Sequence, residues 1–121
     1  MARVVAHLPD LLFGSKVQGM LSAGGHDVAL VGSAPEVRER IAGCEVLVVD
    51  LTADDVAGIA LLEGLQADGA VGETRTLAFY SHVDAGVRAR AIAAGFDLVV
   101  PRSRMAREGS ALVDGLSGRS G

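Results

Sequence analysis

Short apolar runs alternate with longer stretches of helical character along the chain, five times over. The five runs that predict β-strands are Val4–Val5, 27–31, 45–50, 76–80 and 97–100. The third run carries four consecutive apolar residues, Val46 to Val49, with no polar residue between them. A strand of this kind is buried on both faces, which is typical of a parallel sheet covered by helices on each side.

Helix start and stop signals lie between these runs. The expected helices begin after Asp10, at Ser33, at Thr52 or Asp54, at Asp84 and near Ser103, and the last ends near Leu116. Each start is a residue whose side chain can accept a hydrogen bond from the first turn of a helix. Strand and helix repeated five times predict an α/β fold with right-handed crossovers.

Length and composition narrow the class of protein. The 121 residues fit one domain, which we place at 1–116, with 117–121 as a flexible tail rich in Gly and Ser. Half of the residues are apolar, but no apolar run reaches the roughly 18 residues of a membrane span. The single cysteine, Cys44, excludes a disulfide framework and is expected in the core. We therefore expect a cytoplasmic protein without a membrane partner, either monomeric or a weak homodimer.

The net charge and the distribution of basic residues indicate which kinds of partner the protein could bind. The net charge is −4 and only 3% of the residues are aromatic, which argues against nucleic acid as a partner. The dense basic region consists of Arg88, Arg90, Arg102, Arg104 and Arg107. This region is either a patch for an anionic ligand or a protein partner, or a solvated helical surface. Lys16, in Gly14-Ser15-Lys16, falls inside a predicted helix and is interpreted as a solvated side chain rather than part of a phosphate loop.

Polar side chains follow the predicted strands at their carboxyl ends, where open α/β sheets bind ligands. These residues are His7 after the first strand, Asp50 after the third, Ser81 and His82 after the fourth, and Arg102 after the fifth. We expect the carboxylate of Asp50, the hydroxyl of Ser81 and the cation of Arg102 to meet in one small cavity.

Three segments resemble the receiver domains of response regulators. The segments are 4–12, 46–50 and 93–102, and the resemblance extends over residues 3 to about 116. It implies a flavodoxin-like (βα)5 three-layer sandwich with a five-stranded parallel sheet in the order 2-1-3-4-5. It also implies that Asp50 takes the place of the phosphoacceptor, Ser81 that of the switch residue, and Arg102 that of the lysine.

The chain departs from the receiver pattern at the end of the first strand. The acidic pair that would hold Mg²⁺ with the phosphoacceptor is replaced by Ala6 and His7. Neither side chain supplies the oxygen ligands that Mg²⁺ requires. Asp10, one helical turn further on, is a possible substitute. We interpret the chain as a pseudo-receiver that is not an enzyme and needs no cofactor, with Arg102 bridged to Asp50 in place of a phosphate.

The resemblance also implies a partner and a surface. A receiver-like signalling module of a bacterial two-component pathway or phosphorelay binds another signalling protein through the face of its fourth helix, fifth strand and fifth helix. Tyr80, Ser81, Pro101 and Arg102 would lie on or beneath that face.

Several alternatives remain open at this point. The chain could be a genuine phospho-accepting regulator that uses Asp50 and Mg²⁺, or a small flavodoxin-like domain that binds a ligand at the same edge. His7, His82 and Asp50 could together bind a metal, although a histidine at a strand end more often satisfies a local hydrogen bond, and we predict no metal site. His26 lies in a Gly-Gly turn and is expected to be solvated.

Overall fold

Five parallel strands form one sheet in the order β2-β1-β3-β4-β5, as the sequence and its resemblance predict. The computed structural model describes residues 2–81 and 85–118. The strands are β1 (Arg3–His7), β2 (Asp27–Val31), β3 (Val46–Asp50), β4 (Arg75–Tyr80) and β5 (Leu98–Pro101). The helices are α1 (Leu11–Ala23), α2 (Ala34–Arg40), α3 (Asp55–Ala67), α4 (Ala85–Ala94) and α5 (Arg102–Ser117). His82 and the expected helix start at Asp84 lie outside the described residues.

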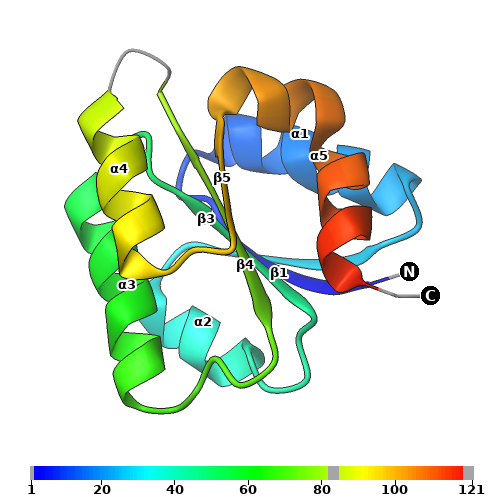
Figure 1. Ribbon diagram of the computed structural model, residues 1–121. Helices are drawn as coiled ribbons and strands as arrows, with labels where there is room; N and C mark the ends of the chain where they lie inside the picture. The colour runs from blue at the N-terminus through cyan, green and yellow to red at the C-terminus, as the bar shows by residue number, and fades with distance from the viewer. Residues whose placement is uncertain (1, 82–84, 119–121) are drawn as a thin grey trace.

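The helices cover both faces of the sheet and make a three-layer sandwich (Figure 1). Helices α1 and α5 pack together on one face, while α2, α3 and α4 lie on the other. In Figure 1, β4 and β5 run upward, so their carboxyl ends lie toward the top of the view. None of the helices in the described ranges is long and apolar enough to cross a membrane.

The central strand β3 separates two apolar cores. All five of its residues are buried, as its unbroken apolar run predicts. Successive side chains of a strand point to opposite faces, so Leu47 and Val49 enter the core under α2, α3 and α4. Val46 and Val48 enter the core under α1 and α5. The sheet is therefore held by apolar packing on both sides.

Helix caps follow the sequence signals in three places. The side chains of Asp10, Ser33 and Asp54 accept hydrogen bonds from backbone N–H groups in the first turns of α1, α2 and α3. Helix α5 begins at Arg102, next to the expected Ser103, but its N-cap, Pro101, offers no side-chain acceptor. It extends through Ser117, so helix continues past the expected start of the tail, and 119–121 lie outside the described residues.

One glycine lets α3 approach the end of β3. Gly58 is buried, and a Cβ atom placed on it would overlap the side chain of Leu51 and press against Val49. A larger residue at this position would force the side chain of Leu51, or the helix itself, to shift.

The single cysteine is part of the core, as expected. Cys44 is 7% exposed, and its Sγ donates a hydrogen bond to the carbonyl of Val46. Burial raises the pKa of the Cys44 thiol, which keeps the thiol protonated at neutral pH. The residue therefore behaves as a small apolar side chain.

His26 is buried, and the expectation that it would be solvated is wrong. The imidazole is 5% exposed because it packs between the start of β1 and α5. Its Nδ1 accepts a hydrogen bond from the backbone N–H of Ala2 at 3.0 Å, and its Nε2 lies 2.8 Å from Oδ1 of Asp114. Nε2 makes no hydrogen bond among the described residues, so its approach to Asp114 is a close contact only. One side chain therefore joins three distant segments of the chain.

We predict that His26→Ala destabilises the fold by about 2–4 kcal/mol, because it opens a cavity and leaves the N–H of Ala2 buried without its acceptor. Urea unfolding followed by circular dichroism measures this. Asp114→Ala is the matched control: the Asp114 side chain is 63% exposed, so its loss should cost under about 1 kcal/mol. Equal stabilities for the two variants would contradict the bridging role of His26.

Candidate functional site

The carboxyl ends of the strands bring most of the expected residues to one edge of the sheet. The register pairs His7 with Val49, Asp50 with Phe79, and Tyr80 with Pro101. Ser81 follows β4 directly, and Arg102 is the first residue of α5. The order of these residues along the edge agrees with the sequence analysis, but their side chains make different contacts from those expected.

Asp50 is buried and bonded to its own loop. The residue is 6% exposed. Its Oδ1 accepts two hydrogen bonds from Thr52, one from the backbone N–H at 2.7 Å and one from the side-chain hydroxyl at 2.6 Å. An acidic side chain that bonds to the residue two positions on is a common turn arrangement. Two donors therefore stabilise the charged carboxylate without help from a cation.

Arg102 does not contact Asp50, and the predicted bridge between them is wrong. In the described part of the chain, the ion pair of Arg102 is with Asp10, whose Oδ2 lies 3.7 Å from the guanidinium. The guanidinium also lies over the ring of Phe13, 4.0 Å from its centroid. A planar guanidinium can stack on an aromatic face in a way that lysine's compact ammonium does not match. The arginine is therefore directed toward α1.

Asp10 is engaged as a helix cap rather than turned toward Asp50. Its Oδ1 accepts hydrogen bonds from the backbone N–H groups of Leu12 and Phe13. Its other oxygen faces Arg102. The Asp10 carboxylate thus contacts both the first turn of α1 and the guanidinium of Arg102.

The two residues in place of an acidic pair have different surroundings. Ala6 is fully buried in the core under α1 and α5. His7 is half-buried, and its Nδ1 has no hydrogen-bond partner among the described residues. Desolvation lowers the pKa of His7, while the carboxylates of Asp50 and Glu36 and the backbone of Gly32 act in the opposite direction with smaller effect. The imidazole is therefore neutral at neutral pH.

The expected common cavity is divided in two. His7 and Asp50 line a cavity of about 290 Å³ on the side of α2 and α3. Ser81 and Arg102 line an open groove of about 720 Å³ between α1 and α5. Ala53, in the loop after β3, borders both spaces. This loop separates the carboxylate from the switch-like hydroxyl and the cation.

Acidic and histidine side chains do not gather densely at this edge. Within residues 2–81 and 85–118, no three His, Cys, Asp or Glu side chains lie close enough to hold a metal ion. The two-histidine hypothesis depends on His82, which is not among the described residues. The described residues therefore do not test whether His7, His82 and Asp50 bind a metal.

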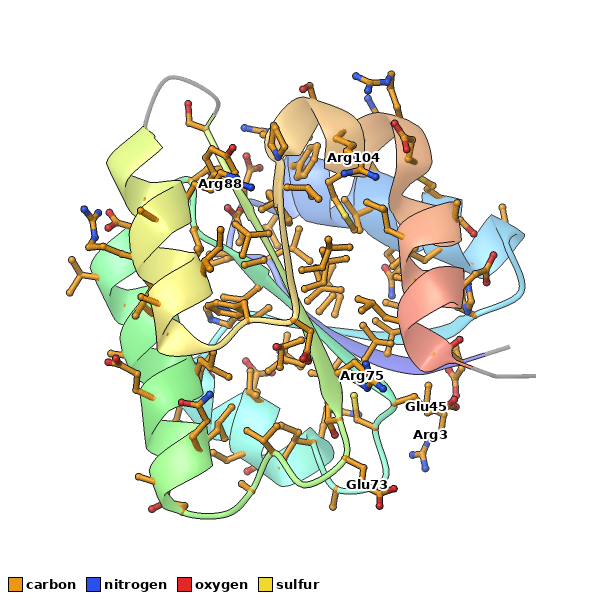
Figure 2. The ribbon with its side chains drawn as sticks, in the orientation of Figure 1. Arg3, Glu45, Glu73, Arg75, Arg88 and Arg104 are labelled. Atoms are coloured by element: carbon orange, nitrogen blue, oxygen red, sulfur yellow. The ribbon has the colours of Figure 1, made fainter. Side chains whose placement is uncertain are left out.

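The face of α4, β5 and α5 carries basic and apolar side chains. Figure 2 shows Arg88 on α4 and Arg104 on α5, on either side of β5. Ile92 of α4 is 47% exposed. Tyr80 is 7% exposed and packs in the core beneath α4, while Pro101 is half-buried. A second group of charged residues, Arg3, Glu45, Glu73 and Arg75, lies at the opposite edge in Figure 2.

The sequence analysis missed the role of Phe13. It is buried in the core, where its ring contacts Phe79 edge to face with centroids 5.4 Å apart. Its other role, as the platform for Arg102, depends on the packing of α1 against the start of α5. The signal in the sequence is slight: an aromatic residue three positions after a capping aspartate, in a chain with four aromatic residues.

Solved structures of receiver domains have this fold. The receiver domain of response regulator 1452 from Francisella matches with a TM-score of 0.83 and 17% identity over 97% of each chain. The chemotaxis protein CheY4 of Vibrio cholerae matches with a TM-score of 0.81 and 14% identity, over 96% of this chain and 98% of that one. A pilus assembly-related protein of Burkholderia pseudomallei matches with a TM-score of 0.77 and 19% identity, over 97% of this chain and 90% of that one.

Comparison of sequences adds no closer relationship. No family model matches the chain, and no curated protein matches it significantly. The structural similarity therefore shows the flavodoxin-like receiver fold, and the function has to be argued from the residues at the carboxyl edge.

We predict that His7 makes the fold less stable at acidic pH. As the pH falls below about 6.5, the unfolded chain takes up a proton at His7 that the folded chain resists, so this group's contribution lowers the free energy of unfolding. His7→Gln should show a smaller loss of stability between about pH 7.5 and about pH 5.5 in urea unfolding. An unchanged pH dependence in the variant would contradict the lowered pKa of His7.

Proposed function

We propose that the protein is a receiver-like signalling module that acts by binding another protein, with Mg²⁺-dependent phosphorylation of Asp50 lost or much weakened. The observation that carries this proposal is the separation of the two residues that would cooperate in a phosphorylated receiver. Asp50 is bonded to Thr52, whereas Arg102 is held by Asp10 and Phe13. A phosphoryl group on Asp50 would have to draw Arg102 away from both of these contacts.

The side chains beside Asp50 support the proposed loss of Mg²⁺ binding. Mg²⁺ requires oxygen ligands in octahedral geometry and is usually held by one or two carboxylates. The end of β1 supplies a buried methyl group, Ala6, and a desolvated imidazole, His7, in place of an acidic pair. Asp10 is committed to the cap of α1. Asp50 alone is a poor magnesium site, so we assign no step to the metal.

The α4–β5–α5 face is the surface that we assign to the partner. It carries Arg88 and Arg104, together with the exposed part of Ile92. Arg90 and Arg104 are less available than Arg88, because Arg90 is paired with Asp55 of α3 and Arg104 with Glu108 of α5. Basic side chains around an exposed apolar residue suit a signalling protein that presents an acidic surface with an apolar contact. In this arrangement Tyr80 supports the face from below.

We predict that acetyl phosphate with Mg²⁺ leaves the protein unmodified, because Asp50 lacks both a metal site and a cation directed at it. Intact-mass spectrometry should show no added phosphoryl group compared with Asp50→Asn, the control for reaction elsewhere. A phosphoryl group present on the wild type and absent from Asp50→Asn would instead favour the alternative of a genuine phospho-accepting regulator.

We predict that partner binding depends on the charge of Arg88. Arg88→Glu should weaken it by about tenfold, since a like charge then faces the acidic partner. Arg40→Glu is the matched control, because Arg40 is exposed on α2, which packs against β1 and β2. Affinity capture with quantitative mass spectrometry should find a protein retained by the wild type and Arg40→Glu but depleted by Arg88→Glu. If no captured protein distinguishes the two variants, the assigned face is wrong.

A further inference from the structure

The sheet has two edge strands, β2 and β5, and they differ in their protection against pairing with another chain. β5 has four residues and ends at Pro101, which carries no backbone N–H. β2 has five residues and no proline, and its charged residue, Asp27, stands at its start. A short strand and a proline are common means of blocking an edge. β2 is therefore the edge that is more open to a further strand.

The outward backbone groups of β2 belong to Val28 and Leu30. On the inner side, the N–H of Asp27 and the carbonyl of Val31 form hydrogen bonds with the residues that flank β1. Because alternate residues of a parallel strand bond to the same neighbour, the N–H and C=O groups of Val28 and Leu30 point away from β1. Among the described residues, the partner of these groups is Gln18 of α1, which donates a long hydrogen bond of 3.5 Å to the Val28 carbonyl. The edge thus keeps donors and acceptors for a neighbouring strand.

The spacing of these groups suits an antiparallel copy of the same strand. When two β2 strands run antiparallel around a two-fold axis at Ala29, Val28 of one copy lies opposite Leu30 of the other. Such a pair exchanges both of its N–H···O=C hydrogen bonds, and the axis generates the pair a second time. Ala29 then faces Ala29 of the second copy, at the position where side chains of antiparallel strands approach most closely. The small side chain of alanine fits this close approach, so β2 is complementary to itself.

Helix α2, which packs on β1 and β2, carries charges that complement a second copy in this orientation. Its first turn contains Glu36, and its last turn contains Arg38 and Arg40. Two α2 helices beside the same two-fold axis run antiparallel, so the acidic start of one lies toward the basic end of the other. Arg38 is paired with Asp68, whereas Arg40 has no ion pair in the described part of the chain. The charges that meet across the axis are therefore those of Glu36 and Arg40.

We propose that the protein forms a weak two-fold homodimer in which two β2 strands pair antiparallel around Ala29 and join the two five-stranded sheets into one. Two-fold symmetry uses the open edge of each copy, so association stops at two chains. β2 and β5 lie at opposite edges of the sheet, so the dimer leaves the α4–β5–α5 face of both copies uncovered. The proposal goes beyond the signalling function, and each can fail without the other.

Sedimentation velocity of the full chain, at concentrations from about 10 μM to about 1 mM, measures the association. We expect the average mass of the wild type to rise from one chain toward two as the concentration increases, without larger species. A wild type that stays monomeric over this whole range would overturn the proposal. Assembly into larger species would also overturn it, because a closed two-fold contact leaves no second copy of the β2 edge to pair.

Charges placed at Ala29 test the geometry of the pairing. Ala29 is half-buried and lines an open hollow of about 320 Å³ beside α2, so a longer side chain has room in the folded monomer. Ala29→Glu and Ala29→Lys should each weaken self-association by about tenfold, because like charges then meet on the axis. An equimolar mixture of the two variants should associate at least as well as the wild type, since opposite charges then meet there. A mixture that stays monomeric while the wild type dimerises would place the interface elsewhere and overturn the proposal.

Matched variants separate this pairing from a general effect of charge. Ala67 is exposed at the end of α3, a helix that packs on β3 and α4. Ala67→Glu and Ala67→Lys should dimerise within about twofold of the wild type, since the added charge lies outside the interface. Weakening equal to that of the Ala29 variants would overturn the proposal. Arg40→Glu should weaken the dimer but retain the partner of the α4–β5–α5 face, which distinguishes the two proposals.

Discussion

The burial of β3 on both faces is the constraint on which the other features depend. Its side chains fill two separate cores, and the strand ends at the point where it leaves both of them. Asp50 is the residue at that point, and it remains 6% exposed. A charged group with so little access to water needs donors nearby, and Thr52 provides two of them. The loop after β3 is therefore shaped by the need to satisfy this carboxylate.

That loop also determines how the edge of the sheet is partitioned. Because Thr52 folds back on Asp50, Ala53 comes to lie between the cavity near α3 and the groove near α5. The carboxylate and the neutral imidazole of His7 are on one side, and the cations are on the other. Arg102 is drawn further away by the ring of Phe13 and the carboxylate of Asp10. Asp50 and Arg102 are thus each satisfied by neighbours of their own rather than by one another.

The sequence predicted the fold well because its signals are local and redundant. Uninterrupted apolar runs identified the strands, and Asp10, Ser33 and Asp54 identified the starts of three helices. The order of the strands came from the resemblance to receiver domains, and the sheet confirms it. The site was less predictable, since it depends on side-chain directions that no local pattern encodes. Spacing placed Arg102 at the correct edge, but its stacking on Phe13 required the packing of α1 beside α5.

His26 illustrates the same difficulty and has a consequence for the molecule as a whole. Glycines around it suggested an exposed turn, yet contacts with residues far away in the sequence bury it. By joining Ala2 to the last turns of α5, this imidazole gathers both ends of the described chain at the edge of the sheet opposite to Asp50 (Figure 1). A circular permutant that links these ends with a short peptide, or a surface tether attached there, would thus leave the carboxyl edge unobstructed.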